Sequence, residues 1–114
     1  MRLILFSGGV LMSDITDTIY EIMVFINLNL FEHITLDMLS NKFSYSKYHL
    51  HRKFKEIAGI TLNAYIRKRR IENSIYLLSA NPDIDITEVA GYCGFSSATY
   101  SREFRNVFNR TPNE

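Results

Sequence analysis

Two segments of the chain match each other at an offset of fifty residues. The segment from Tyr45 to Thr61 aligns with the segment from Phe95 to Thr111, and serine, arginine and phenylalanine recur at matching places within them. Each segment follows a short apolar helix pattern, so two short helices joined by a turn are predicted twice. This arrangement is typical of a helix–turn–helix unit. One small chain with two such units can read two stretches of DNA major groove without forming a dimer.

Basic and acidic residues are segregated along the chain, although the net charge is only +1. Residues 42–70 contain nine Lys/Arg and one acid, whereas residues 13–41 contain five acids and no base. A basic segment set against an acidic remainder suits binding to a polyanion such as DNA. A solvated charged surface would account for a basic run alone, but this run coincides with a predicted recognition helix.

The spacing of apolar residues predicts an all-α fold with two helix-turn-helix subdomains joined by a long central helix. Apolar residues recur at helical spacing, and no stretch shows the sustained alternation of a strand. We expect the first subdomain over residues 13–60, a linker helix over 61–81 and the second subdomain over 82–114. Residues 1–12 fit no part of this pattern, and we expect them to be a non-native or weakly ordered extension.

Capping residues indicate where the helices begin and end. The first helix is predicted from Asp14 to about Leu28. Gly59 and Asn109 are predicted to end the two recognition helices. The N-caps of the second to sixth helices are predicted to be Thr35, Ser46, Thr61, Thr87, and either Ser96 or Ser97.

The helix predicted over residues 47–58 buries one face and exposes the other. Leu50, Phe54 and Ile57 recur at i, i+4 and i+7 and are predicted to face the core. The opposite face suits base edges, since arginine can bind guanine O6 and N7 together and an aromatic ring can contact a thymine methyl. We assign base reading on this helix to Tyr48, His51 and Arg52. We assign phosphate contacts, which supply affinity without sequence choice, to Lys47, Lys53 and Lys55.

The second recognition helix carries small hydroxyl residues that let it lie close to the groove but discriminate poorly between bases. Arg102 is expected to be its main polar reader and Thr99 a methyl contact. We assign base reading here to Ser97, Ala98, Thr99, Ser101 and Arg102. Further phosphate contacts are assigned to Thr61, Arg105 and Thr111. A surface ion pair is an equal alternative for any single arginine, but the recurrence of arginine at 52 and 102 favours DNA reading.

No catalytic or metal-binding set of residues emerges from the sequence. His49 and His51 lie two positions apart on one helix and diverge by about 200°, so they cannot share a metal ion. Cys93 is the only cysteine, which excludes an internal disulfide and favours a buried structural thiol. We expect no enzyme activity and no cofactor. No apolar run has the length that a membrane span needs.

The sequence resembles the AraC/XylS family of bacterial transcription regulators over residues Ile15 to Glu114. The resemblance is carried by YSKYHLHRKFKEIAG, TLNAYIRKRRIENSIYLL, ITEVAGYCGFSS and REFRNVFNRTPNE, in that order. It is closest to compact members of the multiple-antibiotic-resistance activator type. Most members have one more residue between the positions of Phe95 and Arg102, whereas here the two units have equal length.

The resemblance implies a bacterial transcription activator that binds double-stranded DNA, and we expect RNA polymerase as its protein partner. Two unlike recognition helices in one chain predict binding as a monomer, and the single cysteine points to the reducing cytoplasm. The central helix, about 30 Å long, approaches one turn of B-DNA, so the two recognition helices are expected in successive major grooves. Two alternatives stay open. One is a DNA-binding fragment of a longer, effector-controlled regulator. The other is a helical protein-interaction module, which would bury Tyr48 and Arg52 in a protein partner.

Overall fold

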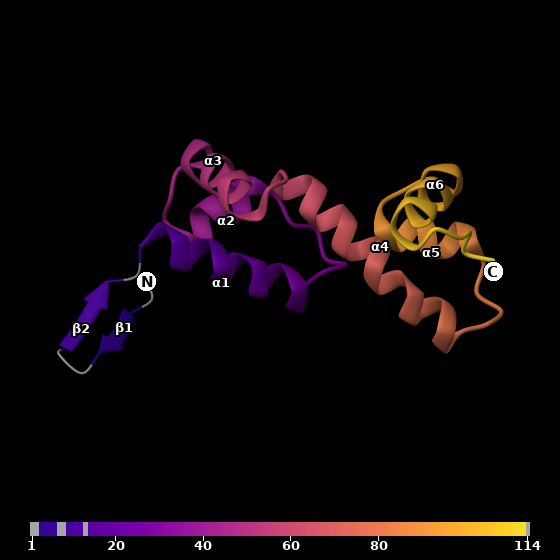
Figure 1. The fold of residues 1–114 in the computed structure, drawn as a ribbon, viewed down its shortest axis with the longest axis horizontal. Helices are drawn as coiled ribbons and strands as arrows, with labels where there is room; N and C mark the ends of the chain where they lie inside the picture. The colour runs from indigo at the N-terminus through magenta and orange to yellow at the C-terminus, as the bar shows by residue number, and fades with distance from the viewer. Residues whose placement is uncertain (1–2, 7–8, 13, 114) are drawn as a thin grey trace. The chain divides into compact units, whose positions relative to one another are not determined.

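The computed structural model describes residues 3–6, 9–12 and 14–113. Its contacts divide the chain into two compact units, Met1–Tyr65 and Ile66–Glu114, with the boundary inside the long helix α4 (Figure 1). Residues 14–113 contain six helices and confirm the predicted all-α fold. Their bounds are α1 Ile15–Leu28, α2 Leu36–Phe43, α3 Lys47–Ala58, α4 Leu62–Ala80, α5 Ile86–Cys93 and α6 Ser97–Phe108.

A short β-hairpin precedes the helices. Strand β1, Leu3–Phe6, pairs antiparallel with β2, Gly9–Met12, with Leu3 opposite Met12 and Phe6 opposite Gly9. This hairpin was not predicted from the sequence, because four-residue apolar runs are too short to show the alternation that identifies a strand. The hairpin comes before the helices in the chain, and residues 14–113 remain all-helical.

The first unit packs α1 and α2 against α3 (Figure 1). Helix α1 begins at an N-cap, Asp14, whose side chain accepts a hydrogen bond from the Asp17 N–H. Its buried face carries isoleucines at helical spacing, Ile19, Ile22 and Ile26. The Phe54 ring meets the edge of the Tyr65 ring, with the ring centroids 5.3 Å apart. Buried apolar residues of this unit include Ile19, Ile22, Ile26, Leu39, Leu50 and Phe54.

The second unit has its own apolar core, contributed by α4, α5 and α6. Ile71 of α4 lies against α5 and α6, and partly buried residues such as Leu78 and Phe108 surround this centre. The fully packed set is Ile71, Val89, Ala90, Cys93, Tyr100 and Phe104. Each recognition helix is therefore supported by a core within its own unit.

The fifty-residue repeat of the sequence is reproduced by the backbone. Helices α5 and α6 begin and end fifty residues after α2 and α3. Ser46 and Ser96 are the N-caps of the two recognition helices, and each accepts a hydrogen bond from the N–H three residues later. Gly59 and Asn109 end the two helices, as predicted, and both lie in the left-handed conformation. The second unit has one residue fewer than most family members between the positions of Phe95 and Arg102. Helix α6 is nevertheless complete and equal in length to α3.

One predicted cap was wrong. Helix α5 begins at Ile86, and its N-cap is Asp85 rather than Thr87. The Asp85 carboxylate accepts a hydrogen bond from the Thr87 N–H, so Thr87 already lies inside the first turn. Aspartate is as strong an N-cap as threonine, and the position of Asp85 is that of Thr35 plus fifty.

Candidate nucleic-acid interface

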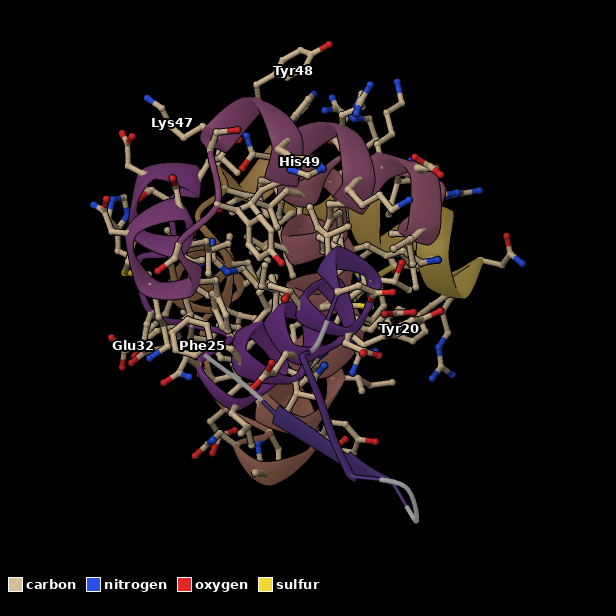
Figure 2. The ribbon with its side chains drawn as sticks, turned by 90° about the vertical axis from the view of Figure 1, so that its left-hand side faces the viewer. Tyr20, Phe25, Glu32, Lys47, Tyr48 and His49 are labelled. Atoms are coloured by element: carbon tan, nitrogen blue, oxygen red, sulfur yellow. The ribbon has the colours of Figure 1, made fainter. Side chains whose placement is uncertain are left out.

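The outer face of α3 brings together the residues predicted to read bases in the first unit. Leu50 and Phe54 are buried, which turns the opposite side of the helix to solvent. Tyr48 is 73% exposed and projects away from the helix (Figure 2). His51 and Arg52 are also exposed, one turn further along. The three residues predicted to read bases from α3 are therefore all exposed on this helix.

Arg52 and Tyr48 interact with each other on this surface. The Arg52 guanidinium carbon lies 5.6 Å from the centroid of the Tyr48 ring, within the range of a cation–π contact. The contact restricts the long arginine side chain before any ligand arrives, which lowers the entropy cost of ordering it. Both side chains stay accessible to a partner.

Two of the predicted phosphate-binding lysines on α3 hold ion pairs within the chain. Lys47 Nζ lies 2.8 Å from the Asp37 carboxylate of α2, and Lys53 Nζ lies 3.2 Å from the Glu56 carboxylate. The sequence analysis did not foresee either pair. Exposed ion pairs are worth at most about 1 kcal/mol, so a phosphate can replace the carboxylate. Lys55 is exposed on the same helix.

The corresponding face of α6 exposes Ala98, Arg102 and Arg105. The hydroxyls of Ser97 and Thr99 are hydrogen-bonded within the unit, to Thr87 and Ser96, at 2.9 and 3.0 Å. Ser101 is partly exposed. Arg102 thus has the same place on α6 that Arg52 has on α3. The five residues predicted to read bases from α6 therefore lie on one helix but spread over about 200° of its surface. Ala98 and Arg102 share the exposed face, whereas Ser97 and Thr99 are partly buried.

The two remaining predicted phosphate contacts lie at helix ends. Thr61 caps α4, as predicted, because its hydroxyl oxygen accepts a hydrogen bond from the Ala64 N–H. Its hydroxyl hydrogen is left to donate to another acceptor. Thr111 is partly exposed, two residues after the Asn109 C-cap of α6.

The first turn of each recognition helix is tied to the preceding helix at one equivalent place. In the first unit the tie is the Asp37–Lys47 ion pair, and fifty residues later it is the Thr87–Ser97 hydroxyl pair. The geometry is shared, but only the first tie carries charge. The first tie should therefore weaken as salt rises, whereas the second is a neutral hydrogen bond.

Behind α6, a buried hydroxyl pair joins this helix to α4. Tyr100 Oη and Ser74 Oγ are 2.7 Å apart, and both residues are fully buried. Burial raises the pKa of the Tyr100 hydroxyl, and its hydrogen bond with Ser74 partly opposes this shift. The hydroxyl therefore stays protonated and can donate.

The thiol of Cys93 is also buried in this core. Burial raises its pKa to about 11, and the nearby Arg70 opposes the shift only in part. The thiolate, which is the nucleophile and the metal ligand, is therefore scarce near neutral pH. Within the described residues, no group of three or more side chains could hold a metal ion. Nor does any helix in this part of the chain have the length and apolar character to cross a membrane.

The outer face of α1 carries an apolar stripe that the sequence analysis missed. Tyr20, Val24 and Leu28 recur every four residues and are exposed, and Phe31 follows after the helix. Tyr20 lies on the surface of α1 (Figure 2). The four-residue spacing of these residues is visible in the sequence, but the buried isoleucines of the same helix give a second apolar face that masks it.

A helix-turn-helix domain family matches residues 39–114 of the chain. The chain is 45% identical over 82 residues to "Probable transcription factor PqrA" of Proteus vulgaris, covering 71% of this chain and 66% of that protein. It is 34% identical over 98 residues to the regulatory protein SoxS of Escherichia coli, covering 84% of this chain and 90% of SoxS. It is 35% identical over 101 residues to the transcriptional regulator Rob of Salmonella typhimurium, covering 87% of this chain but 34% of Rob. The chain thus spans about two thirds of PqrA and one third of Rob.

Solved structures share the fold. The chain matches a regulator from Chromobacterium violaceum with an AraC-type DNA-binding domain at a TM-score of 0.74 and 26% identity, covering 85% of this chain and 87% of that one. The DNA-binding domain of AdpA, solved in complex with a target DNA, matches at a TM-score of 0.66 and 23% identity. The match covers 83% of this chain and 86% of that one.

Proposed function

The chain belongs to the AraC/XylS family of helix-turn-helix transcription regulators, and we propose that it activates transcription by binding specific sites in double-stranded DNA. The observation that carries the proposal is an arginine on the exposed face of each of two recognition helices. Arg52 on α3 and Arg102 on α6 occupy equivalent places, each opposite a buried core face. A relative of the same fold, AdpA, was solved with its target DNA.

The chemistry of the α3 face suits the major groove. Arg52 can donate two parallel hydrogen bonds to guanine O6 and N7, and His51 can donate to a base acceptor. Tyr48 can pack on a thymine methyl while its ring orients the Arg52 guanidinium. On α6, Arg102 takes the guanine-reading role, and Ala98 offers a small apolar contact beside it.

Phosphate contacts supply the sequence-independent part of the affinity. Lys55 and Arg105 occupy equivalent exposed places on α3 and α6. Lys47 and Lys53 join them by exchanging their carboxylate partners for phosphate, and the Thr61 and Thr111 hydroxyls donate at the helix ends. Each neutralised phosphate releases counterions, so these contacts make binding sensitive to salt.

We propose that one chain occupies one site, with the two recognition helices in successive major grooves. Two unlike reading faces on one polypeptide fit an asymmetric site better than a palindrome. Helix α4, with 19 residues, is about 28 Å long at 1.5 Å per residue. In this proposal the helix-turn-helix subdomains comprise residues 13–60 and 82–114, and residues 61–81 link them.

An activator also needs a protein partner, and we propose RNA polymerase in the cytoplasm. The exposed apolar stripe of α1, formed by Tyr20, Val24, Leu28 and Phe31, is a surface available for such a contact. Polymerase recruitment to promoter DNA by the wild type and by Leu28→Ser tests whether this stripe takes part. Equal recruitment by both proteins would place the contact elsewhere.

The function is tested by selecting binding sites from a random DNA pool with wild type, Arg52→Ala and Lys55→Ala. Arg52→Ala should cost about 1–3 kcal/mol at the preferred site, with the loss confined to one or two base pairs. Lys55→Ala, the matched control on the same helix, should weaken binding to preferred and random DNA alike. If both variants lower affinity uniformly and keep the wild-type preference, α3 does not read bases.

A further inference from the structure

We propose that the buried Tyr100–Ser74 hydroxyl pair positions α6 and thereby sets the sequence specificity of the second recognition helix. The inference rests on the proposed function and adds a positioning role to a residue pair that has no access to DNA. Tyr100 belongs to the recognition helix, yet its side chain is fully buried on the side opposite the reading face.

The hydrogen bonds of the pair have a defined direction. Ser74 Oγ donates its single hydrogen to the Ile71 carbonyl oxygen, at 2.7 Å. That hydrogen is then unavailable to Tyr100, so the Tyr100 hydroxyl is the donor in the 2.7 Å contact with Ser74 Oγ. The chain of bonds runs from α6 through Ser74 to the backbone of α4. It joins the recognition helix to a rigid main-chain group.

This connection controls the rotation of α6 about its own axis. Successive residues of an α-helix are separated by about 100°, so Ala98 and Arg102, two positions either side of Tyr100, point about 160° away from it. Any rotation that moves the Tyr100 hydroxyl off Ser74 swings the Arg102 guanidinium across the base edges. Binding groups must be held within about 10–20° of their productive geometry, so a small rotation is enough to weaken base discrimination.

The first unit lacks such a pair at the equivalent position. Leu50, fifty residues before Tyr100, is 1% exposed and has no hydroxyl. Apolar packing resists separation of two helices, but it has less directional preference than a hydrogen bond. The Tyr100–Ser74 pair therefore acts on the second recognition helix alone. Removing it should change one half of the preferred DNA site and leave the other half as it is.

Three variants isolate the effect of the hydroxyl. Tyr100→Phe removes the donor and keeps the ring, while Ser74 keeps its bond to the Ile71 carbonyl. Ser74→Ala instead leaves the Tyr100 donor buried without its acceptor, which is the more costly change. The double variant removes both hydroxyls. Tyr65→Phe is the matched control, since it deletes a tyrosine hydroxyl that accepts a hydrogen bond from Asn27 Nδ2, at 2.9 Å, in the first unit.

The experiment is binding-site selection on each folded variant, after a melting curve confirms cooperative unfolding. The two halves of the site are identified first, as the base pairs whose preference is lost in Arg52→Ala and in Arg102→Ala. Tyr100→Phe should reduce discrimination about three- to tenfold at the Arg102 half only, a part of what one base contact provides. Ser74→Ala should reduce it further, and the double variant should return it toward the Tyr100→Phe value. Tyr65→Phe should match wild type.

Unchanged discrimination in both Tyr100→Phe and Ser74→Ala would overturn the inference, and so would an equal loss in both halves or on random DNA. An equal loss in both halves, or a loss on random DNA, would mean that the pair stabilises the fold without positioning α6. A wild-type protein that selects no preferred site would instead refute the proposed function, and with it this inference. Failure of the inference alone appears as a normal wild-type site with no response to the hydroxyl variants.

Discussion

The Asp37 carboxylate competes with DNA phosphate for Lys47 in the proposed binding mode. The Asp37 carboxylate lies 2.8 Å from Lys47 Nζ, at the first turn of the first recognition helix. A phosphate must displace this carboxylate to reach the lysine. We expect Asp37→Asn to raise affinity for preferred and random DNA up to about fivefold at low salt, since an exposed ion pair is worth up to about 1 kcal/mol. The measurement is a titration of both DNAs by fluorescence anisotropy.

The control for Asp37→Asn is Asp83→Asn, which makes the same change of charge in the exposed segment between α4 and α5. A general gain in electrostatic attraction would raise affinity equally in both variants. The restraint proposed for Lys47 would be refuted by an equal gain. It would also be refuted if combining Asp37→Asn with Lys47→Ala kept the gain.

At the scale of the helices, each recognition helix depends on a few residues that are almost completely buried. Leu50 and Phe104 are 1% and 2% exposed. Truncating either to alanine leaves a cavity, and we expect losses in the free energy of unfolding of about 2–5 kcal/mol for Leu50→Ala and about 3–5 kcal/mol for Phe104→Ala. Chemical denaturation followed by circular dichroism measures both. As a control, Tyr76→Ala on the exposed side of α4 should change the free energy of unfolding by less than about 0.5 kcal/mol. Denaturation curves of Leu50→Ala and Phe104→Ala that both coincide with the wild-type curve would contradict this packing.

The same helices show what the sequence could predict. Caps and apolar spacing are local patterns, so Ser46, Thr61 and Gly59 were placed correctly from the sequence alone. Thr87 was misplaced because Asp85, two residues earlier, is an equally good cap and the sequence does not rank them. The predicted roles in DNA contact are still untested.

Contacts between helices were beyond the sequence analysis. Lys47 and Asp37 lie ten residues apart on different helices, and Tyr100 and Ser74 lie 26 apart. No periodicity connects such pairs, because they depend on how the helices pack. The ion pair changes the expected behaviour of Lys47 as a phosphate contact, which exposure alone would not reveal.

For the whole molecule, two recognition helices in one chain make dimerisation unnecessary. We expect one protein per minimal DNA site in sedimentation equilibrium. Two proteins per minimal site would contradict the monomeric arrangement.

We also expect DNA binding to weaken as the salt concentration rises. The slope of log K against log salt should be roughly −4 to −7 if about five to eight phosphates are contacted. A nearly flat salt dependence would favour a helical protein-interaction module instead of a DNA-binding protein.

The separate support of the two recognition helices has an evolutionary consequence. Helix α3 rests on Leu50 and Phe54, and α6 rests on Tyr100 and Phe104, each within its own unit. A mutation on one exposed face can therefore be selected without disturbing the other helix. In the proposed function each helix reads one half of a site, so a promoter that loses one half can be recovered by change in one helix, while the half read by the other helix is kept at every promoter. Regulatory targets can thus be gained or lost in half-site steps.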